Sequence, residues 1–75
     1  MAYNVAVYKG CNRLGTGSMT NGSKSLSSYT GTAPGTGRNV LITNTSGNHV
    51  GHTIKTRIVT DGGSTLTLQD AGPHS

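Results

Sequence analysis

The class of fold is decided by residues 39–70, which read NVLITNTSGNHVGHTIKTRIVTDGGSTLTLQD. The apolar run at 40–42 predicts a strand that is covered on both faces, and that is therefore central in its sheet or sandwiched against a neighbour. A turn at 46–48 follows it, and the chain then returns as an alternating strand over 49–60. This second half of the chain therefore predicts a β-meander.

The alternation within 49–60 assigns its side chains to two faces. Ile54, Thr56 and Ile58 face one way, while Lys55, Arg57 and Val59 face the other. A tight turn at 61–64 leads into a last strand over 65–70, in which Leu66 and Leu68 point inward.

The first half of the chain has a weaker pattern. Residues 3–9 alternate as a half-buried strand, with Tyr3, Val5 and Val7 on the inner face. Residues 10–23 contain several glycines and predict a loop, and 24–30 predict a weak strand. No stretch has apolar residues at helical spacing.

The predicted fold is therefore all-β, a small barrel or sandwich of about five or six short antiparallel strands with Gly-rich loops. Residues 1–75 form a single domain. Within it, the glycine-rich loop 31–37 and the C-terminal tail 71–75 are expected to be flexible.

The chain has little material for a core. Of its 75 residues, 32 are Gly, Ser or Thr, and Phe and Trp are absent. Cys11 is the only cysteine, so neither a disulfide within the chain nor a zinc site with a cysteine pair can compensate. Self-association is the remaining way to stabilise such a scaffold, so we expect a homo-oligomer.

The charge balance is basic, with six Lys and Arg against two Asp and a net charge of +4. Such a charge suits an acidic partner, either a protein surface or nucleic acid. Arg38, Lys55 and Arg57 are the candidate partner-binding residues, because Lys55 and Arg57 share a strand face. A solvated or subunit-facing surface is the simpler interpretation of the same residues.

Catalytic, cofactor and metal sites are not expected. Asp61 lies in a glycine turn, where its carboxylate favours the turn backbone over proton transfer. His49 and His52 lie on opposite faces of a strand, which disfavours a shared metal. The glycine spacing of residues 31–38 does not fit a phosphate loop. We therefore predict a protein that is not an enzyme.

Targeting signals are not evident in the sequence. The first residues lack a charged segment followed by an apolar core, so no signal peptide is expected. No apolar run approaches the length of a membrane span, so no membrane partner is expected. The protein is predicted to be made in a cytoplasm.

The stretches AYNVAVY at 2–8 and YTGTAP at 29–34, with the Gly- and Thr-rich strand rhythm, resemble small β-rich structural proteins of bacteriophage virions. The resemblance is to capsid decoration (cement) proteins in particular. It implies a homotrimer that stabilises the shell through protein–protein contacts, with the major capsid protein or another virion protein as partner. It places the protein in the virion, and a tail or fibre component is a close variant.

Two other classes of binding protein are open. A small nucleic-acid-binding β-barrel would use Arg38, Lys55 and Arg57 for the phosphates. A carbohydrate-binding module is disfavoured, because sugar platforms need exposed aromatic side chains and the chain has only three tyrosines.

Overall fold

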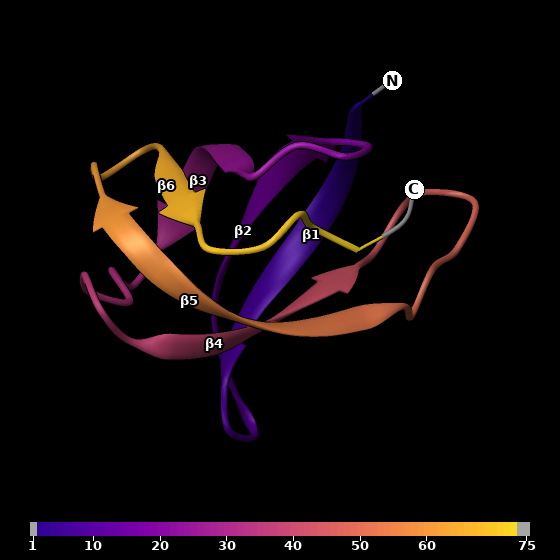
Figure 1. Ribbon diagram of the computed structural model, residues 1–75. Coiled ribbons are helices and arrows are strands. Elements are labelled where there is room, and N and C mark those ends of the chain that lie inside the picture. The colour runs from indigo at the N-terminus through magenta and orange to yellow at the C-terminus, as the bar shows by residue number, and fades with distance from the viewer. Residues whose placement is uncertain (1, 74–75) are drawn as a thin grey trace.

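Six antiparallel strands form a closed barrel in a computed structural model that describes residues 2–73 (Figure 1). The strands are β1 (Ala2–Lys9), β2 (Asn12–Thr20), β3 (Ser25–Gly31), β4 (Asn39–Asn44), β5 (Thr53–Asp61) and β6 (Leu66–Leu68). Their order around the barrel is β1-β2-β3-β6-β5-β4, and β4 pairs with β1 to close the ring. The prediction of a small all-β barrel or sandwich of about five or six antiparallel strands is confirmed, and the structure is the barrel with six strands.

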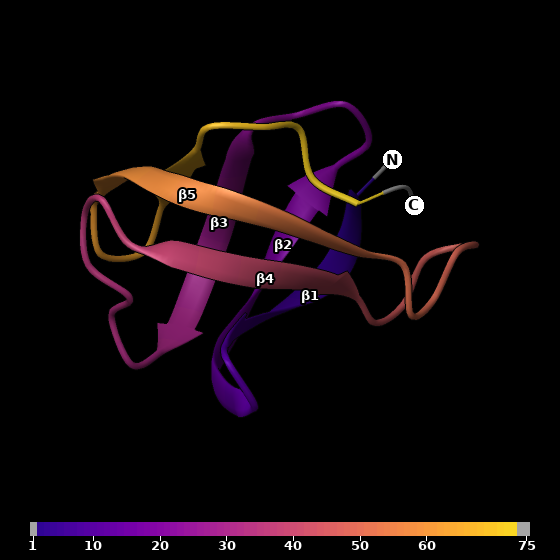
Figure 2. The same ribbon diagram turned by 60° about the horizontal axis from the view of Figure 1, so that its bottom comes forward.

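The barrel consists of two three-stranded meanders. β4 returns from the far side of the first meander to lie beside β1, and β6 pairs with β3, which is a Greek-key connection. Figure 2 shows β4 and β5 lying across the direction of β1, β2 and β3. Every strand thus has a neighbour on both sides.

Alternate residues of the strands fill the interior. The buried hydrophobic side chains form one cluster, which consists of Tyr3, Val5, Val7, Met19, Leu26, Tyr29, Val40, Ile42, Ile58, Leu66 and Leu68. The predicted inner faces of residues 3–9 and 65–70 are confirmed. On β5, Thr56 and Ile58 are buried and Ile54 packs against the cluster, while Lys55, Arg57 and Val59 are exposed.

The prediction of a loop over residues 10–23 is wrong, because residues 12–20 form β2. Gly17 lies opposite Val5 and Gly15 lies opposite Val7, so both glycines face the interior. Their missing side chains leave room for Leu26 and Tyr29 of β3. These glycines therefore admit large neighbours to a narrow barrel, and they do not interrupt the strand.

The prediction of a strand over residues 49–60 begins too early, because β5 starts at Thr53. Asn44 causes the difference. Its buried Oδ1 accepts hydrogen bonds from the backbone N–H groups of Ser46 (3.0 Å) and Gly47 (2.7 Å) and so fixes a turn. Its backbone N–H donates to His52 O at 2.9 Å, which closes the loop.

The prediction that both faces of the strand at 40–42 are covered is also wrong in part. Val40 and Ile42 point into the core, whereas Leu41 lies on the outer wall and is half-buried. A barrel wall has only one inner face, so the middle residue of an apolar run is left outside.

The loop and the tail both contact the barrel. Gly35 N–H donates to Asp61 Oδ2 at 3.0 Å, and Gly37 N–H donates to Ile58 O at 2.7 Å. Pro73 is fully buried, and its carbonyl oxygen accepts a hydrogen bond from the Tyr3 hydroxyl. The flexibility of 31–37 and 71–75 stays a prediction, and residues 74–75 lie outside the described part. Residues 2–73 contain no helix that is long and apolar enough to cross a membrane.

Candidate binding face

The pairing register lines up four outward side chains across four strands. Arg13 of β2 is opposite Tyr8 of β1, Tyr8 is opposite Leu41 of β4, and Leu41 is opposite Lys55 of β5. Neighbouring strands lie about 4.8 Å apart, so the backbone of this row spans about 14 Å. A cation therefore stands at each end of a row whose centre is a half-buried tyrosine and a half-buried leucine.

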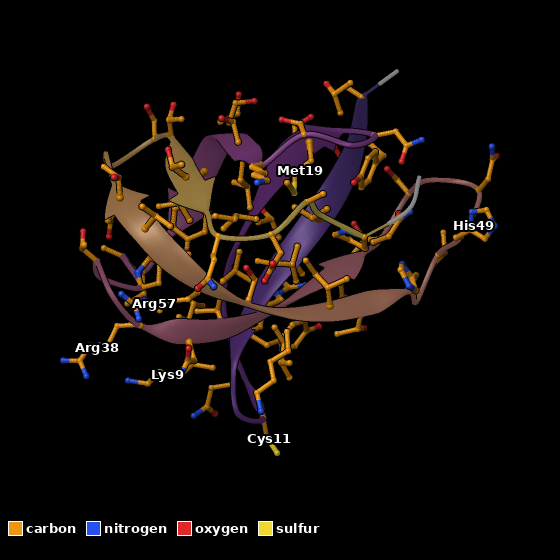
Figure 3. All side chains as sticks on the ribbon, in the orientation of Figure 1. Lys9, Cys11, Met19, Arg38, His49 and Arg57 are labelled. Atoms are coloured by element: carbon orange, nitrogen blue, oxygen red, sulfur yellow. The ribbon has the colours of Figure 1, made fainter. Side chains whose placement is uncertain are left out.

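More cations surround this row. Arg57 is two residues beyond Lys55 on the same side of β5 and lies opposite Asn39. Arg38 precedes Asn39, and its carbonyl oxygen accepts a hydrogen bond from Ile58 N–H at 2.9 Å. Figure 3 shows Lys9, Arg38 and Arg57 at the same end of the barrel. We define the basic face as the outward residues Tyr8, Arg13, Asn39, Leu41, Lys55 and Arg57, together with Lys9 and Arg38 at the adjoining end of the barrel (Figure 3).

The basic face has a shallow hollow beside its apolar centre. Gly10, Asn39, Val40, Leu41 and Lys55 line it, and its volume is about 320 Å³. It is open to solvent and lies next to Leu41 and Lys55.

The two Asp side chains of the chain accept hydrogen bonds from backbone and hydroxyl groups. Asp61 Oδ1 accepts a hydrogen bond from Gly63 N–H and Oδ2 accepts one from Gly35 N–H, both at 3.0 Å. Thr56 Oγ1, whose side chain is buried, donates to Asp70 Oδ2 at 3.3 Å. Five of the six Lys and Arg residues therefore lie on a face whose defining residues include no carboxylate, and their fields add.

The wall formed by the β1 start, β2, β3 and β6 has the opposite character. From Thr16 of β2 onward its outward side chains are small and uncharged by register, and those that reach the surface include Asn4, Thr16, Ser18, Ser25, Ser27, Thr30 and Thr67. We call this set the hydroxyl face. It contains a second open hollow of about 320 Å³, which Asn4, Thr16, Ser18 and Ser28 help to line.

Sequence reasoning identified only part of the basic face. Arg38, Lys55 and Arg57 are brought together, as the shared strand face of the last two predicted. Lys9, Arg13, Tyr8 and Leu41 were missed. Arg13 lay in a region interpreted as a loop, and the β1–β4 pairing that places Tyr8 beside Leu41 joins residues distant in sequence.

The other candidate groups form no site in the described residues. The Asp61 carboxylate binds turn backbone, as expected. Residues 2–73 hold no group of three or more His, Cys, Asp or Glu side chains that could bind a metal ion. Cys11 is exposed in the turn between β1 and β2.

Comparisons with known proteins do not identify this chain. No protein-family model matches it. A search of curated proteins and a search of solved structures likewise give no match. The inference of function therefore depends on the barrel and its two faces.

Proposed function

We propose that the protein is a non-enzymatic virion structural protein, of the bacteriophage capsid decoration type, that self-associates and stabilises the shell through protein–protein contacts. A trimer is the favoured assembly. The observation that supports this proposal best is the division of the barrel wall into a basic face and an uncharged hydroxyl face. A subunit with two unlike faces suits a building block with two kinds of neighbour.

The hydroxyl face is the half that can meet other copies of the chain. The basic face disfavours a symmetric contact with itself, because that would bring five cations against five cations. Small side chains such as Thr16 and Ser27 let a neighbouring surface approach the backbone closely and leave hydroxyl groups for hydrogen bonds. A head-to-tail contact, which joins one part of this face to a different part on the next copy, can close into a ring of three.

A polar contact of this kind is weak by itself. On a shell, however, each subunit meets several neighbours at once, and linked weak contacts give a strong overall attachment. The positive charge of the rest of the barrel adds long-range attraction to an acidic partner surface.

The test is the mass of the protein in solution, measured by light scattering after size exclusion at several protein concentrations. We expect a trimer in the wild type and dissociation in Thr16→Arg, which places a charge at the centre of the hydroxyl face. Asn48→Arg is the matched control, because it adds the same charge to the exposed loop between β4 and β5.

Two outcomes would contradict the proposal. A wild-type monomer at every concentration would exclude self-association. A Thr16→Arg protein that is as trimeric as Asn48→Arg would show that the hydroxyl face is not the interface. Far-UV circular dichroism of both variants checks that each barrel is folded.

A further inference from the structure

The basic face has no role in the contacts between copies proposed above. We infer that it binds a single strand of nucleic acid, with phosphates on its cations and a base stacked on Tyr8. This inference goes beyond the proposed function and does not depend on the contacts between copies, because it concerns the other half of the barrel and gives the basic face another class of ligand than an acidic protein surface.

The arrangement of charge is the first argument. Lys55 and Arg57 are two residues apart on one strand, so their backbones lie about 6.7 Å apart along β5. Arg13 lies at the opposite end of the row, on β2. Arg38 is the residue before Asn39, which is paired with Arg57, and adds a further positive charge there. Both carboxylates of the chain bond other groups. A chain of phosphates can therefore follow this face and meet several cations.

Tyr8 is the second argument. The other two tyrosines are buried, and their hydroxyl groups donate to backbone carbonyls, Tyr3 to Pro73 and Tyr29 to Thr32. Tyr8 is the tyrosine left at the surface, and it stands between Arg13 and Leu41 in the centre of the cations. Proteins that bind single strands combine these two elements, a basic track and an aromatic ring on which a base stacks.

The shape of the face favours a single strand over a duplex. The face is the outer wall of a barrel that measures 28 × 22 × 19 Å, and its shallow hollow lies beside Leu41. A base can stack on a tyrosine ring only when it is free of its partner base. A duplex would present phosphates to the cations but leave Tyr8 unused.

The experiment measures the fluorescence anisotropy of a labelled 15-nucleotide oligo(dT) with the purified protein at several salt concentrations. We expect salt-dependent binding. In the double variant Lys55→Gln/Arg57→Gln, affinity at low salt should fall at least about ten-fold. The slope of log K against log salt should become shallower by about 1.4, since each phosphate contact to a single strand contributes about 0.7. Lys24→Gln, which removes a cation outside the face, should bind as the wild type does.

Substitutions of Tyr8 distinguish the contribution of base stacking to affinity from the contribution of the cations. Tyr8→Leu should weaken binding about five-fold or more with an unchanged salt slope, whereas Tyr8→Phe should bind as the wild type does, because the ring is retained. Leucine keeps an apolar side chain at this half-buried position, and circular dichroism confirms the fold of each variant.

Three results would overturn the inference. The first is no salt-dependent binding even at low salt. The second is an equal affinity for a duplex of the same sequence. The third is a combination of two findings: poly-glutamate competes with the labelled oligonucleotide as effectively as unlabelled oligo(dT) does, and Tyr8→Leu does not change the affinity for the oligonucleotide. That last result would instead indicate an acidic protein surface as the partner.

Discussion

Two glycines of β2 determine how large the neighbouring side chains of the core can be. A methyl group on Gly15 would lie 2.8 Å from Cζ of Tyr29, and nearer still to the carbonyl oxygen of Thr30. A methyl group on Gly17 would overlap Cδ2 of Leu26. Real Cβ atoms do not approach other atoms this closely, so the backbone of β3 at Thr30, or for Gly17 the buried side chain of Leu26, would have to move.

Alanine substitutions test this role. Gly17→Ala should lower the free energy of unfolding by about 1–3 kcal/mol, the usual effect of overpacking, and Gly15→Ala by more, because it meets backbone. Asn12→Ala, at an exposed position of the same strand outside both faces, should change it by less than about 0.5 kcal/mol. Urea unfolding followed by circular dichroism measures all three variants. Equal stability of Gly17→Ala and Asn12→Ala would contradict this packing of the core.

The two buried tyrosines predict sensitivity to alkali. Burial raises the pKa of Tyr3 above its ordinary value of 10.0. Burial, and then the negative charge of Asp61, raise the pKa of Tyr29. Below pH 10 both phenols are protonated in the folded and the unfolded chain. As the pH rises through the interval between ordinary and raised pKa, only the unfolded chain loses these protons, so the free energy of unfolding falls.

Urea titrations between pH 8 and pH 11 measure this effect. We expect the double variant Tyr3→Phe/Tyr29→Phe to lose stability less steeply above about pH 10 than the wild type, because phenylalanine has no proton to release. Its stability at neutral pH should be lower, because two hydrogen bonds to backbone carbonyls are removed. An unchanged alkaline slope would show that the loss comes from other groups.

Among the elements, β6 is the shortest strand but supplies two fully buried side chains, Leu66 and Leu68. It pairs with β3 on one side and with β5 on the other, so it completes the ring. The backbone continues this attachment after the strand, since Gln69 N–H donates to Arg57 O at 2.9 Å.

Leu68→Ala should therefore destabilise the barrel by about 2–5 kcal/mol, which is the usual range for a buried leucine. The control Gln69→Ala, at the exposed next residue, should have a small effect. The free energy of unfolding in urea measures both variants. A small effect of Leu68→Ala would mean that β6 is not an integral part of the barrel.

The elements also show where sequence patterns are informative. Strands β1, β5 and β6 were predicted because their polar and apolar residues alternate. β2 was not, because its inward positions hold Gly15 and Gly17, which carry no hydrophobic signal. The start of β5 was misplaced because one buried side chain, Asn44, organises the loop before it.

On the scale of the whole molecule, the all-β class could be predicted but the order of the strands could not. The order depends on the pairs β1–β4 and β3–β6, which join residues far apart in sequence. The basic face, too, could be predicted only in part from the sequence. Lys55 and Arg57 share a strand, so their common face was predictable, whereas Arg13 and Tyr8 join them only through closure of the ring.

The single barrel is about as compact as folded monomers of its mass usually are. Its accessible surface is 4161 Å², and a folded monomer of this mass exposes about 4,300 Å². What is sparse is the number of large side chains inside, since the core cluster has eleven members and Phe and Trp are absent from the chain. Association with other copies would raise the apparent stability of such a small core by mass action.

Closure of the barrel also limits how any partner can attach. Proteins with a free sheet edge can recruit an extended peptide by β-augmentation, in which main-chain hydrogen bonds provide much of the affinity. Here each strand already pairs on both sides along at least part of its length. Recognition is therefore left mainly to side chains on the wall, and new binding specificities can evolve by exchanging outward residues while the inward set that maintains the fold stays unchanged.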